Sequence, residues 1–68
     1  MKPISGKRMC QVLKKHGWTH IRTKGSHRAF KRTEHPATIV VPVHGNKDLK
    51  PGLQRAIMND AGLTDDDL

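Results

Sequence analysis

Apolar residues near the start of the chain recur at the spacing of an amphipathic helix. One face of that helix would hold, at positions i, i+3, i+4 and i+7, Met9, Val12, Leu13 and His16. Lys, Arg and Gln occupy the other faces. Ser5 is suited to cap the first turn, and Gly17 is suited to the residue that ends a helix. The pattern predicts a helix between Ser5 and Gly17.

The middle of the chain has the pattern of short strands. Residues 18–24 are rich in β-branched side chains, and Gly25 and Ser26 suit a two-residue hairpin turn. A second strand is expected at about 27–32, and a third at 38–43 after a loop at 33–37. Pro42 cannot donate a backbone hydrogen bond, so the third strand ends there or lies at an edge.

A second helix is predicted after the strands. Pro51 suits its first turn, and Gly62 would end it. Its apolar stripe consists of Leu53, Ala56, Ile57 and Ala61. The acidic residues 65–67 are expected to form a frayed or solvated end, although Thr64 could cap one more turn. The expected fold is a single α+β domain over residues 1–68, with both helices on one face of a three-stranded antiparallel sheet.

The predicted hairpin separates an apolar face of the sheet from a cationic one. A two-residue turn pairs Lys24 with His27 and Ile21 with Phe30. Alternation then places Ile21 and Phe30 in the core, and it places His27 nearer the other face with Arg22, Lys24 and Lys31. The third strand has two possible registers, in which either Ile39, Val41 and Val43 or Val40 and Pro42 face the core. In both registers His44 lies at the same end of the sheet as His27.

Composition narrows the class of protein. Thirteen Lys and Arg against six Asp and Glu leave a formal charge of +7 on 68 residues, which favours a polyanionic partner such as RNA or DNA. The small apolar fraction does not suffice for a deep pocket, so no large organic cofactor is expected. His16 and His20 have an i, i+4 spacing, but Gly17 and Trp18 should break the helix between them, so no metal site is expected either. Cys10, the only cysteine, lies on the first predicted helix. No segment is apolar enough to span a membrane, and a reducing cytoplasmic location is expected.

Histidine is the chemically interesting residue of the cationic face. His27 with His44 nearby could accept and donate protons at a phosphodiester, while Lys24, Arg28 or Lys47 stabilised the charge. RNA is the expected substrate, because its 2′-hydroxyl can act as the nucleophile. The alternative is that His27 only contacts phosphate. Trp18 could stack on a base, but packing between helix and sheet is the simpler role.

The ordered set of motifs resembles the HicA family of bacterial and archaeal toxins. The motifs are Ser5-Gly6-Lys7, Gly17-Trp18, Gly25-Ser26-His27 with Phe30, Val41 to Lys47, Leu49 to Gly52, and Arg55 to Ile57 ahead of Ala61-Gly62-Leu63. The resemblance implies a fold like that of a double-stranded-RNA-binding domain, mRNA cleavage with His27 as the catalytic residue, and a HicB-type antitoxin that masks the active surface. A catalytic role for His44 follows only from the hairpin geometry. Residues 52–55 depart from the common family pattern.

These observations predict a metal-independent endoribonuclease toxin that arrests growth and is neutralised by its antitoxin. The residues expected to bind RNA are Lys24, Ser26, Arg28, Lys31 and Lys47. Backbone contacts should dominate, which predicts weak sequence preference and strong salt dependence. Two alternatives remain open, a non-catalytic RNA-binding module and an inactive relative that serves as an antitoxin-binding decoy.

Overall fold

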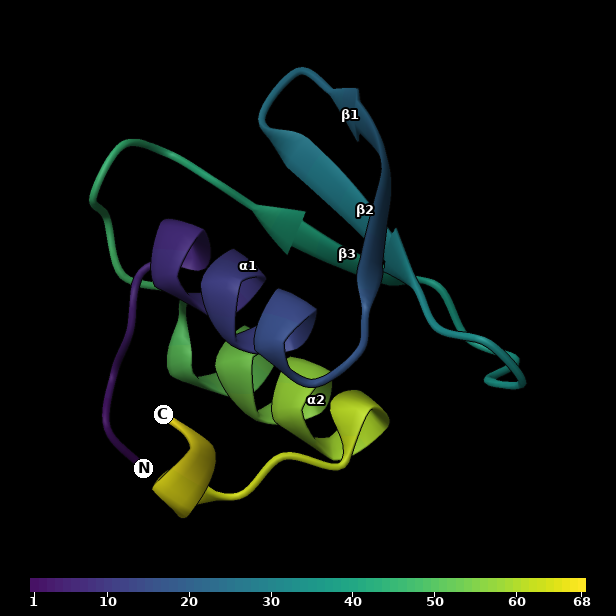
Figure 1. The fold of residues 1–68 in the computed structure, drawn as a ribbon. Coiled ribbons are helices and arrows are strands. Elements are labelled where there is room, and N and C mark those ends of the chain that lie inside the picture. The colour runs from purple at the N-terminus through teal and green to yellow at the C-terminus, as the bar shows by residue number, and fades with distance from the viewer.

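The computed structural model describes residues 1–68 and has the predicted order of elements. Helices α1 (Gly6–Lys15) and α2 (Pro51–Ala61) lie on one face of an antiparallel sheet (Figure 1). The sheet contains β1 (Thr19–Lys24), β2 (His27–Lys31) and β3 (Ile39–Pro42) in the order β1-β2-β3. This confirms the α+β fold class. Neither helix has the length and apolar character needed to cross a bilayer.

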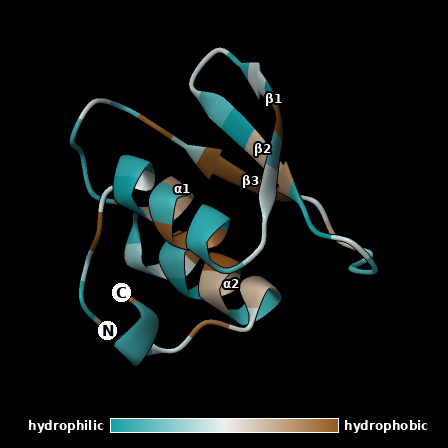
Figure 2. Ribbon diagram, viewed as in Figure 1, coloured by the Kyte–Doolittle hydropathy of each residue, from teal (hydrophilic) through white to brown (hydrophobic).

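Helix α1 begins and ends at the predicted residues. The Ser5 hydroxyl accepts a hydrogen bond from the Arg8 N–H at 3.0 Å, which satisfies one of the free donors of the first turn. His16 is the last, half-helical residue, and Gly17 follows with φ +91°. The apolar residues Met9, Val12 and Leu13 of α1 are buried, whereas its Lys and Arg residues are exposed. The outer side of α1 is teal in Figure 2, the colour of hydrophilic residues.

The β1–β2 hairpin contains a bulge that the sequence did not predict. Lys24 pairs with His27 as expected, but the register shifts between Arg22 and His20, so His20 and not Ile21 pairs with Phe30. The His20 ring lies 5.4 Å from the Phe30 ring, and Ile21 is 45% exposed. The expectation that Ile21 packs in the core with Phe30 is therefore wrong. A bulge adds one residue to one strand and breaks the alternation of faces at that point.

Burial decides the register of β3. Ile39 and Val41 are buried, whereas Val40 is 44% exposed on the opposite face. The strand ends at Pro42, and beyond it the N–H of Val43 donates to the carbonyl of Ser26 at 2.7 Å. Of the two registers left open by the sequence, the one with Ile39 and Val41 in the core is confirmed.

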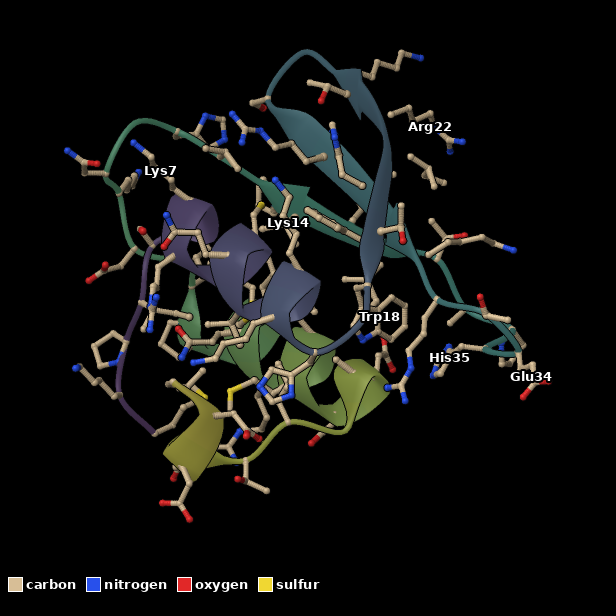
Figure 3. The ribbon with its side chains drawn as sticks, in the orientation of Figure 1. Lys7, Lys14, Trp18, Arg22, Glu34 and His35 are labelled. Atoms are coloured by element: carbon tan, nitrogen blue, oxygen red, sulfur yellow. The ribbon has the colours of Figure 1, made fainter.

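The core occupies the space between the sheet and the helices. It contains fourteen buried side chains, and Phe30 and Leu13 at its centre are inaccessible to solvent. Trp18 is also buried, and its ring meets the His35 ring edge-on with the ring centroids 4.7 Å apart (Figure 3). Trp18 therefore packs between helix and sheet, and neither Trp nor Phe is exposed for stacking on a base.

Gln54 ties α2 to the N-terminal segment. Its side chain is fully buried, accepts a hydrogen bond from the Ile4 N–H at 3.0 Å and donates one to the Lys2 carbonyl at 2.6 Å. Gln54 is thus a buried polar side chain with both its hydrogen-bonding ends satisfied.

We expect Gln54→Leu to lower the free energy of unfolding by about 1–3 kcal/mol, because it leaves the buried Ile4 N–H and the Lys2 carbonyl without partners. Urea denaturation of the full chain measures the loss. Gln11→Leu is the matched control, since Gln11 is exposed on α1 and the change in side chain is the same. Equal losses in the two variants would contradict this role for Gln54.

The acidic C-terminus forms one more turn, and its Asp65 and Asp66 side chains are exposed, as expected of a solvated end. Asp65–Asp67 form a 3-10 turn, in which the Thr64 N–H donates to the Asp67 carboxylate at 2.7 Å. This hydrogen bond lowers the pKa of Asp67 below that of an ordinary aspartate. Asp67 also lies 3.6 Å from the His16 ring, and Leu68 packs against the core. The capping role considered for Thr64 is confirmed.

Candidate nucleic-acid interface

The positive charges of the chain are concentrated and have no acidic partners. Ten of the thirteen Lys and Arg residues precede Glu34, which is the first acidic residue. The two ion pairs within 4.0 Å involve the N-terminal amine and His16, so no Lys or Arg side chain is paired with a carboxylate. Such an uncompensated surface attracts polyanions and adds little to the stability of the fold. Nowhere do three His, Cys, Asp or Glu side chains gather as they would around a metal ion.

The face of the sheet that is turned away from the helices carries a small cationic hollow. It has a volume of about 170 Å³ and is lined by Arg22, Lys24, His27, Ala29 and Val40. We call it the outer hollow. Lys24 and His27 are cross-strand partners beside the Gly25-Ser26 turn, and Arg22 pairs with Ala29. The small side chain of Ala29 forms the floor, so the longer side chains of Arg22, Lys24 and His27 stand around it.

Two of the predicted RNA-binding residues, Ser26 and Lys31, do not line the outer hollow. Ser26 is in the turn, where its backbone carbonyl accepts a hydrogen bond from the Val43 N–H. Lys31 lies on the same face by alternation, four residues beyond His27, and it lines a separate hollow with Arg32 and His35.

The side chains of Arg28 and Lys47 do not lie beside that of His27. Arg28 lies on the helix side of β2, where its charge acts on the Cys10 thiol. Burial nevertheless raises the pKa of Cys10, which agrees with a buried thiol in the core. Lys47 lies on the loop before α2. Of the three cations considered for charge stabilisation, only Lys24 lines a hollow with His27.

Arg22 was not among the predicted RNA-binding residues, although it lines the outer hollow. The signal was present in the sequence, because the two-residue turn places Arg22 on the face of Lys24 and His27. Arg22 projects from β1 away from the helices (Figure 3).

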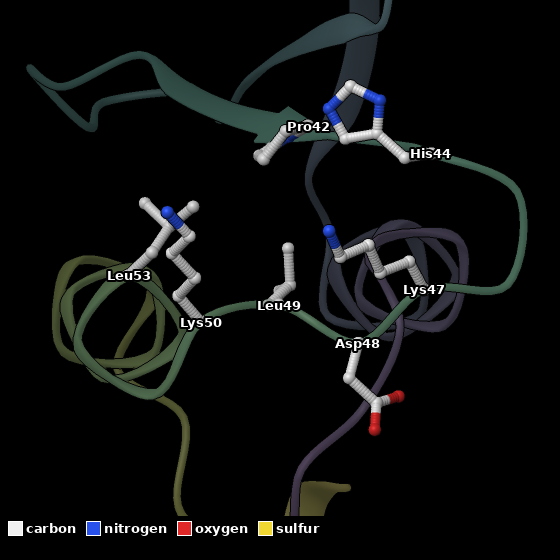
Figure 4. A pocket seen from close by; sticks show the side chains of 7 residues that line it. All are labelled: Pro42, His44, Lys47, Asp48, Leu49, Lys50 and Leu53. Atoms are coloured by element: carbon white, nitrogen blue, oxygen red, sulfur yellow. The ribbon is translucent and has the colours of Figure 1, made fainter.

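The two histidines of interest lie at the same end of the sheet but in different hollows. Pro42 pairs with His27, and His44 follows two residues later. The His44 ring lines a larger hollow, of about 390 Å³, between β3 and the start of α2 (Figure 4). The structure therefore does not bring the two imidazoles together around one small site.

Comparison with known proteins assigns the chain to a family. A family model described as the HicA toxin of bacterial toxin–antitoxin systems matches residues 6–63. The chain belongs to the HicA toxin family. No curated protein matches it. The matched region contains both helices, the whole sheet and the two hollows of His27 and His44. Membership of the HicA family makes the chain a toxin of a toxin–antitoxin system and implies an antitoxin partner.

Proposed function

We propose that this HicA-family chain is an endoribonuclease that cleaves mRNA at the outer hollow, with His27 as the catalytic residue. The observation that carries the proposal is the grouping of one exposed imidazole with two unpaired cations, Arg22 and Lys24, in one hollow. An imidazole can exchange protons near neutral pH, and the two cations suit the charge of a phosphodiester.

The reaction that these groups support is an internal transesterification of RNA. His27 takes the proton from the 2′-hydroxyl as the O2′–P bond forms, and the P–O5′ bond breaks. The leaving O5′ oxygen takes a proton from water or from an imidazolium. Arg22 and Lys24 bind the non-bridging oxygens, whose negative charge increases in the transition state. The products carry a 2′,3′-cyclic phosphate and a 5′-hydroxyl, and DNA is not cleaved because it lacks the nucleophile.

The antitoxin partner follows from the same surface. A HicB-type protein with acidic groups opposite Arg22, Lys24 and His27 would compensate the unpaired charges and exclude RNA from the outer hollow. Association would be fast and sensitive to salt, because it depends on complementary charge. Release of the antitoxin would expose the hollow and allow the toxin to arrest growth by cleaving mRNA.

The test of this proposal is the chemistry of the RNA ends. Purified protein incubated with single-stranded RNA in EDTA should give 2′,3′-cyclic phosphate and 5′-hydroxyl ends, identified by mass spectrometry. RNA with a 2′-O-methyl group at the cleaved nucleotide should resist, because the nucleophile is blocked. Products with 5′-phosphate ends, formed only when magnesium is present, would show that the proposed reaction is wrong.

A further inference from the structure

The largest hollow of the molecule has no part in the cleavage proposed above. It lies between the end of β3 and the start of α2 and has a volume of about 390 Å³. Its polar lining consists of His44, Lys47, Lys50 and Asp48, and its apolar lining includes Leu53 and Pro42 (Figure 4). We call it the α2 hollow.

The charged groups of the α2 hollow favour an anion. Figure 4 shows the amino groups of Lys47 and Lys50 reaching toward the space below β3, while the carboxylate of Asp48 points away from it. Neither lysine is within 4.0 Å of a carboxylate. Lys50 is also the cap residue of α2 and provides no side-chain cap, and the first turn contains no acid. The positive end of the helix therefore adds to the charge of the two lysines.

The apolar side of the hollow indicates which class of anion fits it. Leu53 is 39% exposed there although it is a large apolar side chain, and Pro42 lies opposite it. Inorganic phosphate would make no use of this surface. A nucleotide would use both sides, since its phosphate can contact Lys47 and Lys50 while its ribose or base covers Leu53.

We propose that the α2 hollow is a second RNA subsite, which binds a nucleotide next to those at the cleaved bond. This inference rests on the proposed function. The two hollows lie on either side of the edge strand β3, because Pro42 of β3 lines the α2 hollow on the helix side and is the cross-strand partner of His27, which lines the outer hollow on the other face. An RNA strand that crosses the edge of the sheet at the end of β3 reaches both. His44 then contributes to binding at the second subsite and not to proton transfer at the first.

Binding measured without cleavage tests the subsite directly. In a His27→Ala background, Lys47→Gln with Lys50→Gln should weaken binding of a fluorescent RNA dodecamer about tenfold or more. The slope of log K against log salt should become shallower by about 1.4, because two phosphate contacts to a single strand are lost. The matched control is Lys15→Gln with Arg55→Gln, which removes the same charge from exposed positions outside both hollows. Equal losses in the two pairs would overturn the proposal.

The length of the RNA gives a second readout. Affinity of the His27→Ala protein should rise when a trinucleotide is extended to the dodecamer, and the Lys47 and Lys50 pair should lose most of that gain. In the protein that retains His27, the same pair should raise KM for the dodecamer and leave kcat unchanged. If the pair fails to fold in a thermal melt, His44→Gln provides the same comparison with a smaller expected loss.

The outcomes separate the subsite from the proposed function. Absence of cleavage by the unaltered protein would remove the catalytic proposal, and the binding series would still show whether the α2 hollow contacts RNA. Unchanged RNA affinity, together with lost affinity for the antitoxin, would identify the hollow as a protein contact and overturn the subsite. A fall in kcat with unchanged KM would place these lysines in the reaction itself and would also overturn it.

Discussion

Replacing His27 with alanine is expected to reduce RNA cleavage by a factor of about 10²–10⁴, the range typical for loss of a general acid or base. Binding should persist, because Arg22 and Lys24 remain in the outer hollow. The side chain of His27 is exposed, so the fold should be unaffected. Single-turnover cleavage of labelled RNA measures the first effect, and fluorescence anisotropy with a thermal melt measures the other two.

His20→Ala is the matched control for this experiment. His20 is an exposed histidine of the same hairpin, but it lies on the other side of the sheet against Phe30. We expect it to cleave RNA like the unaltered protein. Full activity in His27→Ala would show that the outer hollow is not the active site. Binding without cleavage by the unaltered protein would instead favour an RNA-binding module or an antitoxin-binding decoy.

The parts of the fold that depend on local chemistry could be predicted from the sequence. Ser5 caps α1 because a hydroxyl next to a helix start reaches the N–H three residues on. Gly25 has φ +58°, which a two-residue hairpin turn requires, so the pairing of Lys24 with His27 followed from the turn alone. That pairing also predicted that Lys24 and His27 lie side by side, as they do in the outer hollow.

The bulge at Ile21 depends on packing that no local pattern reveals. Every residue of β1 is exposed to some degree, so burial does not impose a strict alternation of faces on this strand. His20 instead packs against Phe30, and its Nε2 lies 2.8 Å from the Thr23 hydroxyl. The C-terminal turn, in contrast, has a local cap in Thr64, and two distant contacts add to it: Asp65 lies 3.8 Å from the N-terminal amine, and Asp67 lies 3.6 Å from the His16 ring.

Strand alternation is sufficient to predict the direction of some side chains of the candidate site but not of others. Alternation along β2 would have separated Arg28 from His27, because adjacent residues of a strand face opposite sides. The prediction that Arg28 acts together with His27 rested on the cluster of charge in the sequence and ignored the direction of the two side chains. His44 and Lys47 were harder to place, because they lie on the loop after Pro42, where no repeating pattern fixes their direction.

Gly6→Ala is expected to be the most destabilising single change outside the core side chains. A Cβ at Gly6 would overlap the carbonyl oxygen of Pro42 and would also lie 3.3 Å from the Cα of Val43. These are backbone atoms, so no rotation of a side chain relieves the clash, and α1 must move away from the end of β3. Overpacking of this kind costs about 1–3 kcal/mol or more. For a domain of this size the melting temperature should fall by roughly 4–8 °C for each kcal/mol.

Gly52→Ala is the control, and it should shift stability in the opposite direction. Gly52 also lies in the first turn of a helix, but nothing lies within 4 Å of the position that its Cβ would take. Alanine there should raise stability by about 0.5–1 kcal/mol, since it replaces glycine in a helix without a clash. Melting both variants beside the unaltered protein therefore separates the close approach of α1 and β3 from the general effect of adding a methyl group. Shifts of the same sign would mean that Gly6 is not held against the backbone of Pro42.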